Sequence, residues 1–114
     1  MTTERRIGEV CLSLGCTARI VVVDFTDWLD TASLASCTAV ELDSSDLTIG
    51  SVSVESSSTT DPYTGETIAA SKAANIPITC LSTLNAGVRK VVVTPTDNSS
   101  TPQSEPMILE INLV

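Results

Sequence analysis

The chain has 114 residues, of which 42% are hydrophobic, 3% aromatic and 18% charged, and its 14 acidic and 6 basic residues give a formal net charge of −8. This length makes one domain with a core of its own, and the low charge fraction argues against disorder. The absence of histidine removes the commonest general base and metal ligand, and basic and aromatic residues are few, so we expect no enzyme, no cofactor and no nucleic-acid partner.

The N-terminal segment carries two positive charges, Arg5 and Arg6, but it does not have the pattern of a secretory signal. Gly8 and Glu9 interrupt the apolar stretch that follows, and no window approaches the length of a membrane span. We therefore expect a protein made in the cytoplasm with no membrane contact. We interpret residues 1–16 as an N-terminal arm whose deletion leaves the domain folded.

The first half of the chain predicts short strands separated by turns. A β-branched run over 18–25 predicts a strand, and the acidic segment 24–30 predicts a tight turn or a single helical turn. Residues 36–42 form the next expected strand, in which Val40 and Leu42 share a face. These lengths are typical of an antiparallel β-protein rather than of a helical one.

The alternation of apolar residues changes phase near Gly50. Leu47 and Ile49 lie in one phase, whereas Val52 and Val54 lie in the other. A phase change of this kind indicates either a bulge or the meeting of two strands.

A polar segment and a proline-containing strand follow. Residues 56–66 predict an exposed loop, and 67–75 predict a weak strand or extended loop, with a helical turn as the alternative. Alternation over 76–80 predicts a strand. Pro77 within it indicates an edge position or a bulge, because proline cannot donate to a β-ladder.

The last third of the chain contains the clearest strands. We expect one over 88–94, closed by Pro95, then a polar turn over 97–102 and a final alternating strand over 107–113. About seven short strands with regular turn signals predict an all-β fold, an Ig-like antiparallel β-sandwich over residues 17–114.

The four cysteines, Cys11, Cys16, Cys37 and Cys80, have three interpretations. We favour small apolar core residues, followed by disulfides, of which a Cys37–Cys80 bridge between sheets is one. Zinc is the least favoured, because only Cys11 and Cys16 are near neighbours and their spacing is not that of a zinc site.

The acidic residues Asp24, Asp27 and Asp30, with Asp43 and Asp46 nearby, are the best candidates for chemistry. They could hold calcium, which prefers converging carboxylate oxygens. They could instead cap a short helical turn, and we favour this interpretation because the spacing is not that of an EF-hand. No catalytic motif accompanies the many serines.

The aromatic residues are few enough to be weighed singly. Trp28, beside Phe25 and Leu29, is expected to close one end of the core, with a partner contact as the alternative. Tyr63 stands in the polar loop and is the aromatic residue that we expect to contact a partner.

The order of several short motifs resembles a family of small virion proteins of tailed bacteriophages, often called fiber-tail adaptor proteins, which have an Ig-like β-sandwich. The motifs are Asp-Phe-Thr-Asp-Trp-Leu at 24–29, Leu-Thr-Ile-Gly-Ser-Val at 47–52, Leu-Asn-Ala-Gly at 84–87 and the valine strand at 91–93. The resemblance covers roughly residues 17–114. This chain lacks the tyrosine that the family has in the valine strand and the Gly-Arg that the family has in the last turn.

This resemblance implies a non-enzymatic structural protein of a tailed-phage virion, docked at the neck or tail and linking fibers or other components. Its partners would be portal, adaptor, tail, fiber or capsid proteins in a multi-copy assembly. Contacts would come from the N-terminal arm, through Arg5, Arg6 and Ile7, and from the loop with Tyr63. Two alternatives stay open, a capsid decoration (cement) protein and an Ig-like module of a bacterial adhesin.

Overall fold

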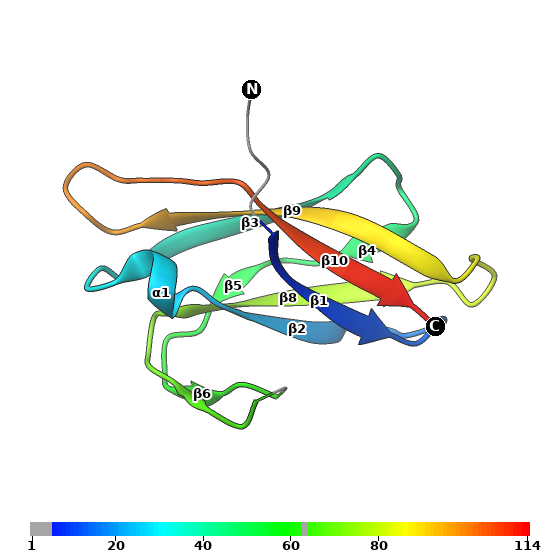
Figure 1. Ribbon diagram of the computed structural model, residues 1–114, viewed down its shortest axis with the longest axis horizontal. Coiled ribbons are helices and arrows are strands. Elements are labelled where there is room, and N and C mark those ends of the chain that lie inside the picture. The colour runs from blue at the N-terminus through cyan, green and yellow to red at the C-terminus, as the bar shows by residue number, and fades with distance from the viewer. Residues whose placement is uncertain (1–5, 63) are drawn as a thin grey trace.

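Alternating apolar side chains build two sheets that pack face to face (Figure 1). The computed structural model describes residues 6–62 and 64–114. In this part of the chain the strands are β1 (Arg6–Leu12), β2 (Arg19–Asp24), β3 (Leu34–Leu42), β4 (Leu47–Ile49), β5 (Ser53–Val54), β6 (Thr59–Thr60), β7 (Thr67–Ile68), β8 (Ala73–Cys80), β9 (Gly87–Asp97) and β10 (Met107–Leu113), and the helical turn α1 spans Thr26–Leu29.

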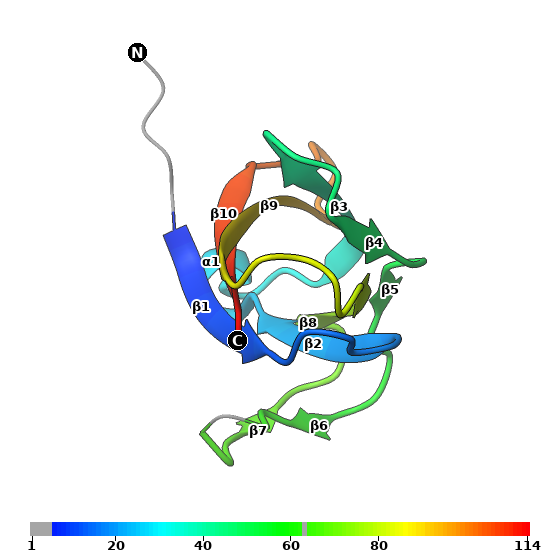
Figure 2. The same ribbon diagram turned by 90° about the vertical axis from the view of Figure 1, so that its right-hand side faces the viewer.

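The strand order is that of an Ig-like sandwich. Sheet A has the order β1-β10-β9-β3, and sheet B has the order β2-β8-β4, with β5 also paired to β8. With the small β6–β7 hairpin set aside and β4 and β5 counted as one interrupted strand, the second, fourth and fifth of seven strands form one sheet. The third, sixth and seventh lie in the other, as in immunoglobulin domains. The expected all-β sandwich is therefore confirmed, and Figure 2 shows sheet A curving over sheet B.

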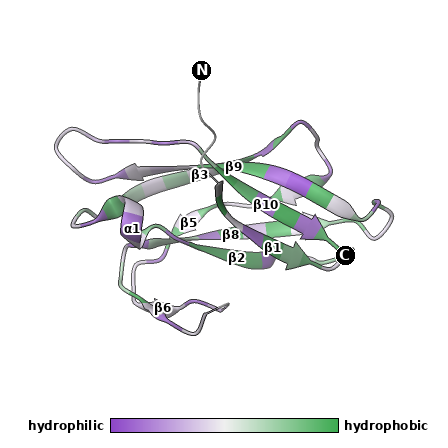
Figure 3. Ribbon diagram, viewed as in Figure 1, coloured by the Kyte–Doolittle hydropathy of each residue, from purple (hydrophilic) through white to green (hydrophobic). Residues whose placement is uncertain are grey.

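The core fills the space between the two sheets. Each strand turns alternate residues inward, and hydrophobic residues run along β1, β2 and β10, whereas the connections are mainly hydrophilic or neutral (Figure 3). The fully buried side chains include Val21, Ile76, Ile78, Val91, Val93, Met107, Ile111 and Leu113.

The N-terminal strand β1 differs from our expectation of an arm over residues 1–16. Residues Arg6–Leu12 belong to the sandwich, where they pair with β10. Val10 and Leu12 are only 7% and 5% exposed, and this burial attaches the segment to the core. The β1–β10 pairing is parallel, whereas we expected antiparallel strands. A parallel neighbour is possible because no hairpin joins β1 to β10, and the chain passes through strands of both sheets before it reaches β10.

We expected Pro77 to mark an edge position or a bulge. Strand β8 lies in the middle of sheet B, so the edge position is wrong, and the irregularity lies in the strand pair opposite, between β4 and β5. The carbonyl of Pro77 accepts the N–H of Gly50. In an antiparallel strand the nitrogen and carbonyl of one residue face the same neighbour, so the missing N–H of Pro77 falls at the break between β4 and β5. The phase change at Gly50 and the proline are thus one irregularity, and they allow β8 to stay central.

Pro95 does not close the penultimate strand, because β9 continues to Asp97 and pairs with β3 there. The N–H of Asp97 donates to the carbonyl of Gln103, on the β10 side of β9. Pro95 lies two residues before Asp97, so its nitrogen faces the same side. Strand β10 begins only at Met107, opposite Val93. The missing donor of Pro95 therefore costs no ladder bond.

The polar segment after β5 is a hairpin rather than an open loop. Strands β6 and β7 pair, and the hairpin lies on the outer side of sheet B (Figures 1 and 2). Ile68 anchors it, with only 2% of the side chain exposed. The chain then turns at Ser71, whose φ is 61°, and enters β8 at Ala73, so the segment 67–75 is extended apart from this turn.

Candidate functional site

A groove runs along the open side of the sandwich, between the edge strands β1 and β2. Its volume is about 210 Å³, and we call it the edge groove. Hydrophobic side chains and three carboxylates line it, and they come from both sheets and from the β6–β7 hairpin. The lining residues are Ile7, Gly8, Glu9, Val10, Val22, Val23, Asp24, Asp61 and Leu109.

The edge groove brings together the two regions in which we expected partner contacts. Ile7 is half-buried and lines the groove from β1. Asp61 lines it from the hairpin that carries position 63. Arg6 is the first residue of β1, but its side chain, like Arg5 and Tyr63 as whole residues, lies outside the described residues.

The backbone of β1 adds a second binding feature. On one side β1 pairs with β10, and within the described strands it is the end of sheet A, so its other side has no strand neighbour. Such an edge can accept an additional strand through main-chain hydrogen bonds. Between Arg6 and Gly8 the register with β10 shifts, which places an irregularity at the start of the edge.

The outer face of sheet A carries a row of apolar residues that sequence reasoning missed. Val40, Val92 and Ile108 oppose one another on neighbouring strands, and Val40 is 64% exposed. Val40 and Leu42 do share a face, as expected, but this face is the outer one. The run Val91–Val93 was an available signal, because consecutive valines place apolar groups on both faces of a strand.

Of the acidic residues near α1, Asp24 is the one whose carboxylate bonds to the turn. The Asp24 carboxylate accepts the backbone N–H of Thr26 at 2.9 Å, and Asp27 lies in the first turn of α1. Asp30 ends the helix with a positive φ of 55°, and its backbone carbonyl accepts a hydrogen bond of 3.0 Å from the Lys72 ammonium group. Within residues 6–62 and 64–114, no group of three His, Cys, Asp or Glu residues is arranged to hold a metal ion.

The aromatic residues of α1 pack at one end of the core. Phe25 and Leu29 are buried, and Trp28 is half-buried against the same cluster. The rings of Phe25 and Trp28 meet edge to face, with 6.5 Å between their centroids. The structure therefore places this motif as a plug of the sandwich.

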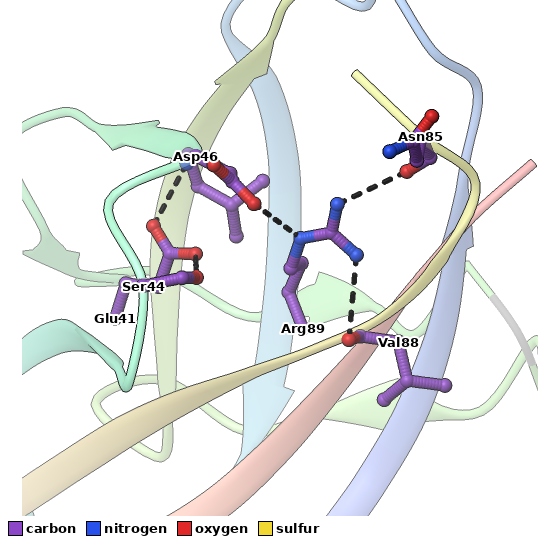
Figure 4. A network of polar contacts seen from close by, with 7 residues as sticks. Glu41, Ser44, Asp46, Asn85, Val88 and Arg89 are labelled. Atoms are coloured by element: carbon purple, nitrogen blue, oxygen red, sulfur yellow. Dashed lines mark hydrogen bonds and ion pairs between the residues drawn. The ribbon is translucent and has the colours of Figure 1, made fainter.

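A polar network joins the loop after β3 to β9 (Figure 4). Arg89 donates from Nε to Asp46 at 2.8 Å and from Nη2 to the carbonyl of Asn85 at 3.0 Å. Glu41 accepts the backbone N–H of Leu47 and the hydroxyl of Ser44. Arg89 points to the same side of β9 as the buried Val91. A charged residue at this position in a valine-rich strand was a signal for a partly buried ion pair that sequence reasoning missed.

The cysteines are all unbridged, and the Cys37–Cys80 bridge considered above is not formed. Cys37 lies in β3 of sheet A, where burial raises the pKa of its thiol to about 11. Cys80 lies at the end of β8, and its sulfur is 3.4 Å from that of Cys16. Two cysteines that are 64 residues apart in sequence therefore meet, and no local pattern announces this contact.

Comparison with protein-family models, with curated proteins and with solved structures finds no match. No helix among the described residues is long and apolar enough to cross a membrane.

Proposed function

We propose that this protein is a non-enzymatic structural component of a tailed-phage virion that docks on a neighbouring virion protein through the edge groove. The observation that carries the docking proposal is the meeting of Ile7 and Asp61 in one groove beside an unpaired strand edge. The N-terminal strand and the β6–β7 hairpin then act as one surface rather than as two separate contacts.

The groove sets the chemistry of the partner. Its apolar side chains, among them Ile7, Val22 and Leu109, favour an extended segment with apolar residues. The carboxylates of Glu9, Asp24 and Asp61 surround them, so basic residues at the ends of that segment would find opposite charge. The net charge of −8 acts in the same direction.

The virion part of the proposal rests on the resemblance of the motifs. In this fold the motif at 24–29 forms the plug α1, and the motif at 84–87 leads into β9. The motif at 47–52 covers β4 and the break after it. The motifs therefore fall on a turn and on strands of a sandwich, a fold that serves many roles, and the virion assignment rests on the resemblance of the sequence motifs.

Complementation with a groove variant tests this proposal. Cells carrying a phage genome that lacks this gene would express either the wild-type chain or Ile7→Glu, which adds a charge within the groove. The matched control is Val40→Glu, which adds the same charge on the outer face of sheet A, where the side chain is 64% exposed.

We expect wild type and Val40→Glu to be incorporated into purified particles, and Ile7→Glu to be depleted at least tenfold by immunoblot. Folding of each variant is checked by its melting curve. Equal incorporation of all three proteins would refute docking through the groove. Immunogold labelling over the whole capsid shell would favour a decoration protein, and wild-type chain found only in the medium or on bacteria would refute the virion proposal.

A further inference from the structure

Cys16 and Cys80 form a close pair of thiols outside the edge groove. Cys16 lies in the connection 13–18 between β1 and β2, and Cys80 is the last residue of β8. Their sulfurs are 3.4 Å apart, and the backbone N–H of Cys80 donates to the carbonyl of Cys16 at 3.0 Å. The backbones are therefore direct neighbours, like residues opposed in a β-ladder.

This arrangement suits a disulfide. Hydrogen-bonded residues of neighbouring strands have Cα atoms about 5.5 Å apart, and disulfides span Cα separations of roughly 4.4–6.8 Å. The sulfurs already face each other, so bond formation requires them to approach to about 2.05 Å by small side-chain rotations.

The two thiols differ in accessibility. Cys16 is half-buried and lines a small cavity of about 70 Å³ with Ser13 and Arg19, whereas Cys80 is almost fully buried. The Cys80 thiol donates to the carbonyl of Ser13 at 3.3 Å, which holds it beneath Cys16. A reagent from solvent therefore meets Cys16 first, and Cys80 stands where it can complete the reaction.

The other two cysteines have no neighbouring thiol within hydrogen-bond distance. Cys11 is exposed on β1 and lines the same small cavity as Cys16, with the Asn112 side-chain nitrogen at 3.9 Å from its sulfur, whereas Cys37 lies in β3 on the opposite edge of sheet A. Both thiols are unbridged and therefore serve as controls in the same chain.

We propose that Cys16 and Cys80 form a thiol–disulfide exchange site whose co-substrate is a low-molecular-weight disulfide. The Cys16 thiolate attacks one sulfur of that disulfide, which breaks its S–S bond, forms a mixed disulfide and releases the first small thiol. The Cys80 thiolate then attacks the Cys16 sulfur and releases the second small thiol. The two protein thiols are oxidised by two electrons, the small disulfide is reduced, and the two released thiolates take up the two protons.

The bridge would tie the connection that follows β1 to the end of β8. It would close a loop of more than sixty residues and thus restrict the unfolded chain. Folding of the reduced protein would not require it, because the thiols are already packed in place.

Peptide mapping of the full chain after incubation with oxidised glutathione tests the proposal. Trypsin cleavage after Arg6, Arg19, Lys72 and Arg89 releases peptides 7–19 and 73–89, which contain Cys16 and Cys80. Because peptide 7–19 also contains Cys11, the decisive protein is Cys11→Ser. Cys37→Ser is the matched control, and Cys16→Ser removes the reacting thiol.

We expect a cross-link between peptides 7–19 and 73–89 in Cys11→Ser and Cys37→Ser, and no link between these peptides in Cys16→Ser. The melting temperature of oxidised Cys11→Ser should rise by roughly 10 °C and return after reduction. A stable glutathione adduct on Cys16 without the link, a link from Cys37, or no reaction of the folded chain would overturn the proposal. The mapping of Cys11→Ser decides the question even if Cys16→Ser does not fold.

Discussion

Gly50 and Pro77 fit against each other across the break between β4 and β5. The N–H of Gly50 donates to the carbonyl of Pro77 at 2.8 Å, and a Cβ added at Gly50 would lie 3.2 Å from the Cβ of Pro77. The absence of a side chain at one residue therefore makes room for the ring of the other. The break between β4 and β5 has no ladder bond that would require an N–H at Pro77, and Gly50 leaves room for the proline ring. Together they allow a proline in a central strand.

A double-mutant cycle tests this contact. Gly50→Val crowds the proline ring, and we expect it to lower the free energy of unfolding by about 1–2 kcal/mol. In a Pro77→Ala background the same change should cost at least about 0.5 kcal/mol less, because the ring is gone. The measurement is urea unfolding of the four proteins. Additive effects would show that the two residues are not coupled.

The Arg89–Asp46 pair fixes the end of the sandwich at which β9 begins. The Arg89 side chain is 15% exposed and the Asp46 side chain 38%, so solvent screens the pair only in part. We expect Arg89→Met to cost about 1–3 kcal/mol, because it removes the charged hydrogen bonds while keeping the apolar stem. The control is Lys90→Met, the exposed neighbour on the other face, with a change below about 0.5 kcal/mol. Equal effects in denaturant unfolding would contradict this role.

The Asp97 carboxyl group makes the free energy of unfolding depend on pH in the acid range. The Gln103 N–H at 2.9 Å and the Ser99 hydroxyl at 2.8 Å hold the pKa of Asp97 below its usual value. A carboxyl group whose pKa is lower in the folded state stabilises the folded protein fully at a pH above its unfolded-state pKa of about 3.9. This stabilisation is lost as the pH falls through the folded-state pKa.

We therefore expect Asp97→Asn to lower the melting temperature at pH 7 and to flatten the acid decline below about pH 4. Ser99→Ala, which removes one donor, should act in the same direction but less. Melting curves between pH 2 and 7 provide the measurement. An unchanged acid decline in Asp97→Asn would show that its turn does not contribute.

Local patterns predict much of this fold, because each strand must turn one phase toward the core. The alternation over 107–113 identified β10, and the phase change near Gly50 marked the boundary between β4 and β5. Asp24 also has the turn-capping contact that we favoured over a calcium site.

The remaining features depend on contacts between distant residues. The register irregularity between Arg6 and Gly8 interrupts alternation in β1, and its parallel partner β10 is almost the whole chain away, so residues 1–16 resembled an arm. The Cys16–Cys80 contact is equally non-local. The edge groove draws on four separate segments of the chain, and the sequence indicated two of them without showing that they lie close together.

The two faces of sheet A can be distinguished by one isosteric change. Valine and threonine have nearly the same shape, so Val→Thr reports whether a hydroxyl is buried. Val91→Thr should cost about 1–3 kcal/mol, because Val91 is fully buried, whereas Val40→Thr should change stability by less than about 0.5 kcal/mol. Chemical denaturation of both variants provides the comparison. A larger loss at Val40 would place the core on the wrong side of the sheet.

Substitutions in β1 distinguish a strand that contributes to the core from a loosely attached arm. Leu12 is 5% exposed between the sheets, and its neighbour Cys11 is exposed. Leu12→Ala should therefore cost about 2–4 kcal/mol through lost burial and a cavity, whereas Cys11→Ala should cost less than about 0.5 kcal/mol. Urea unfolding of both variants is the measurement. If Leu12→Ala were as stable as wild type, residues 6–12 would contribute no core packing and would behave as the arm that the sequence predicted.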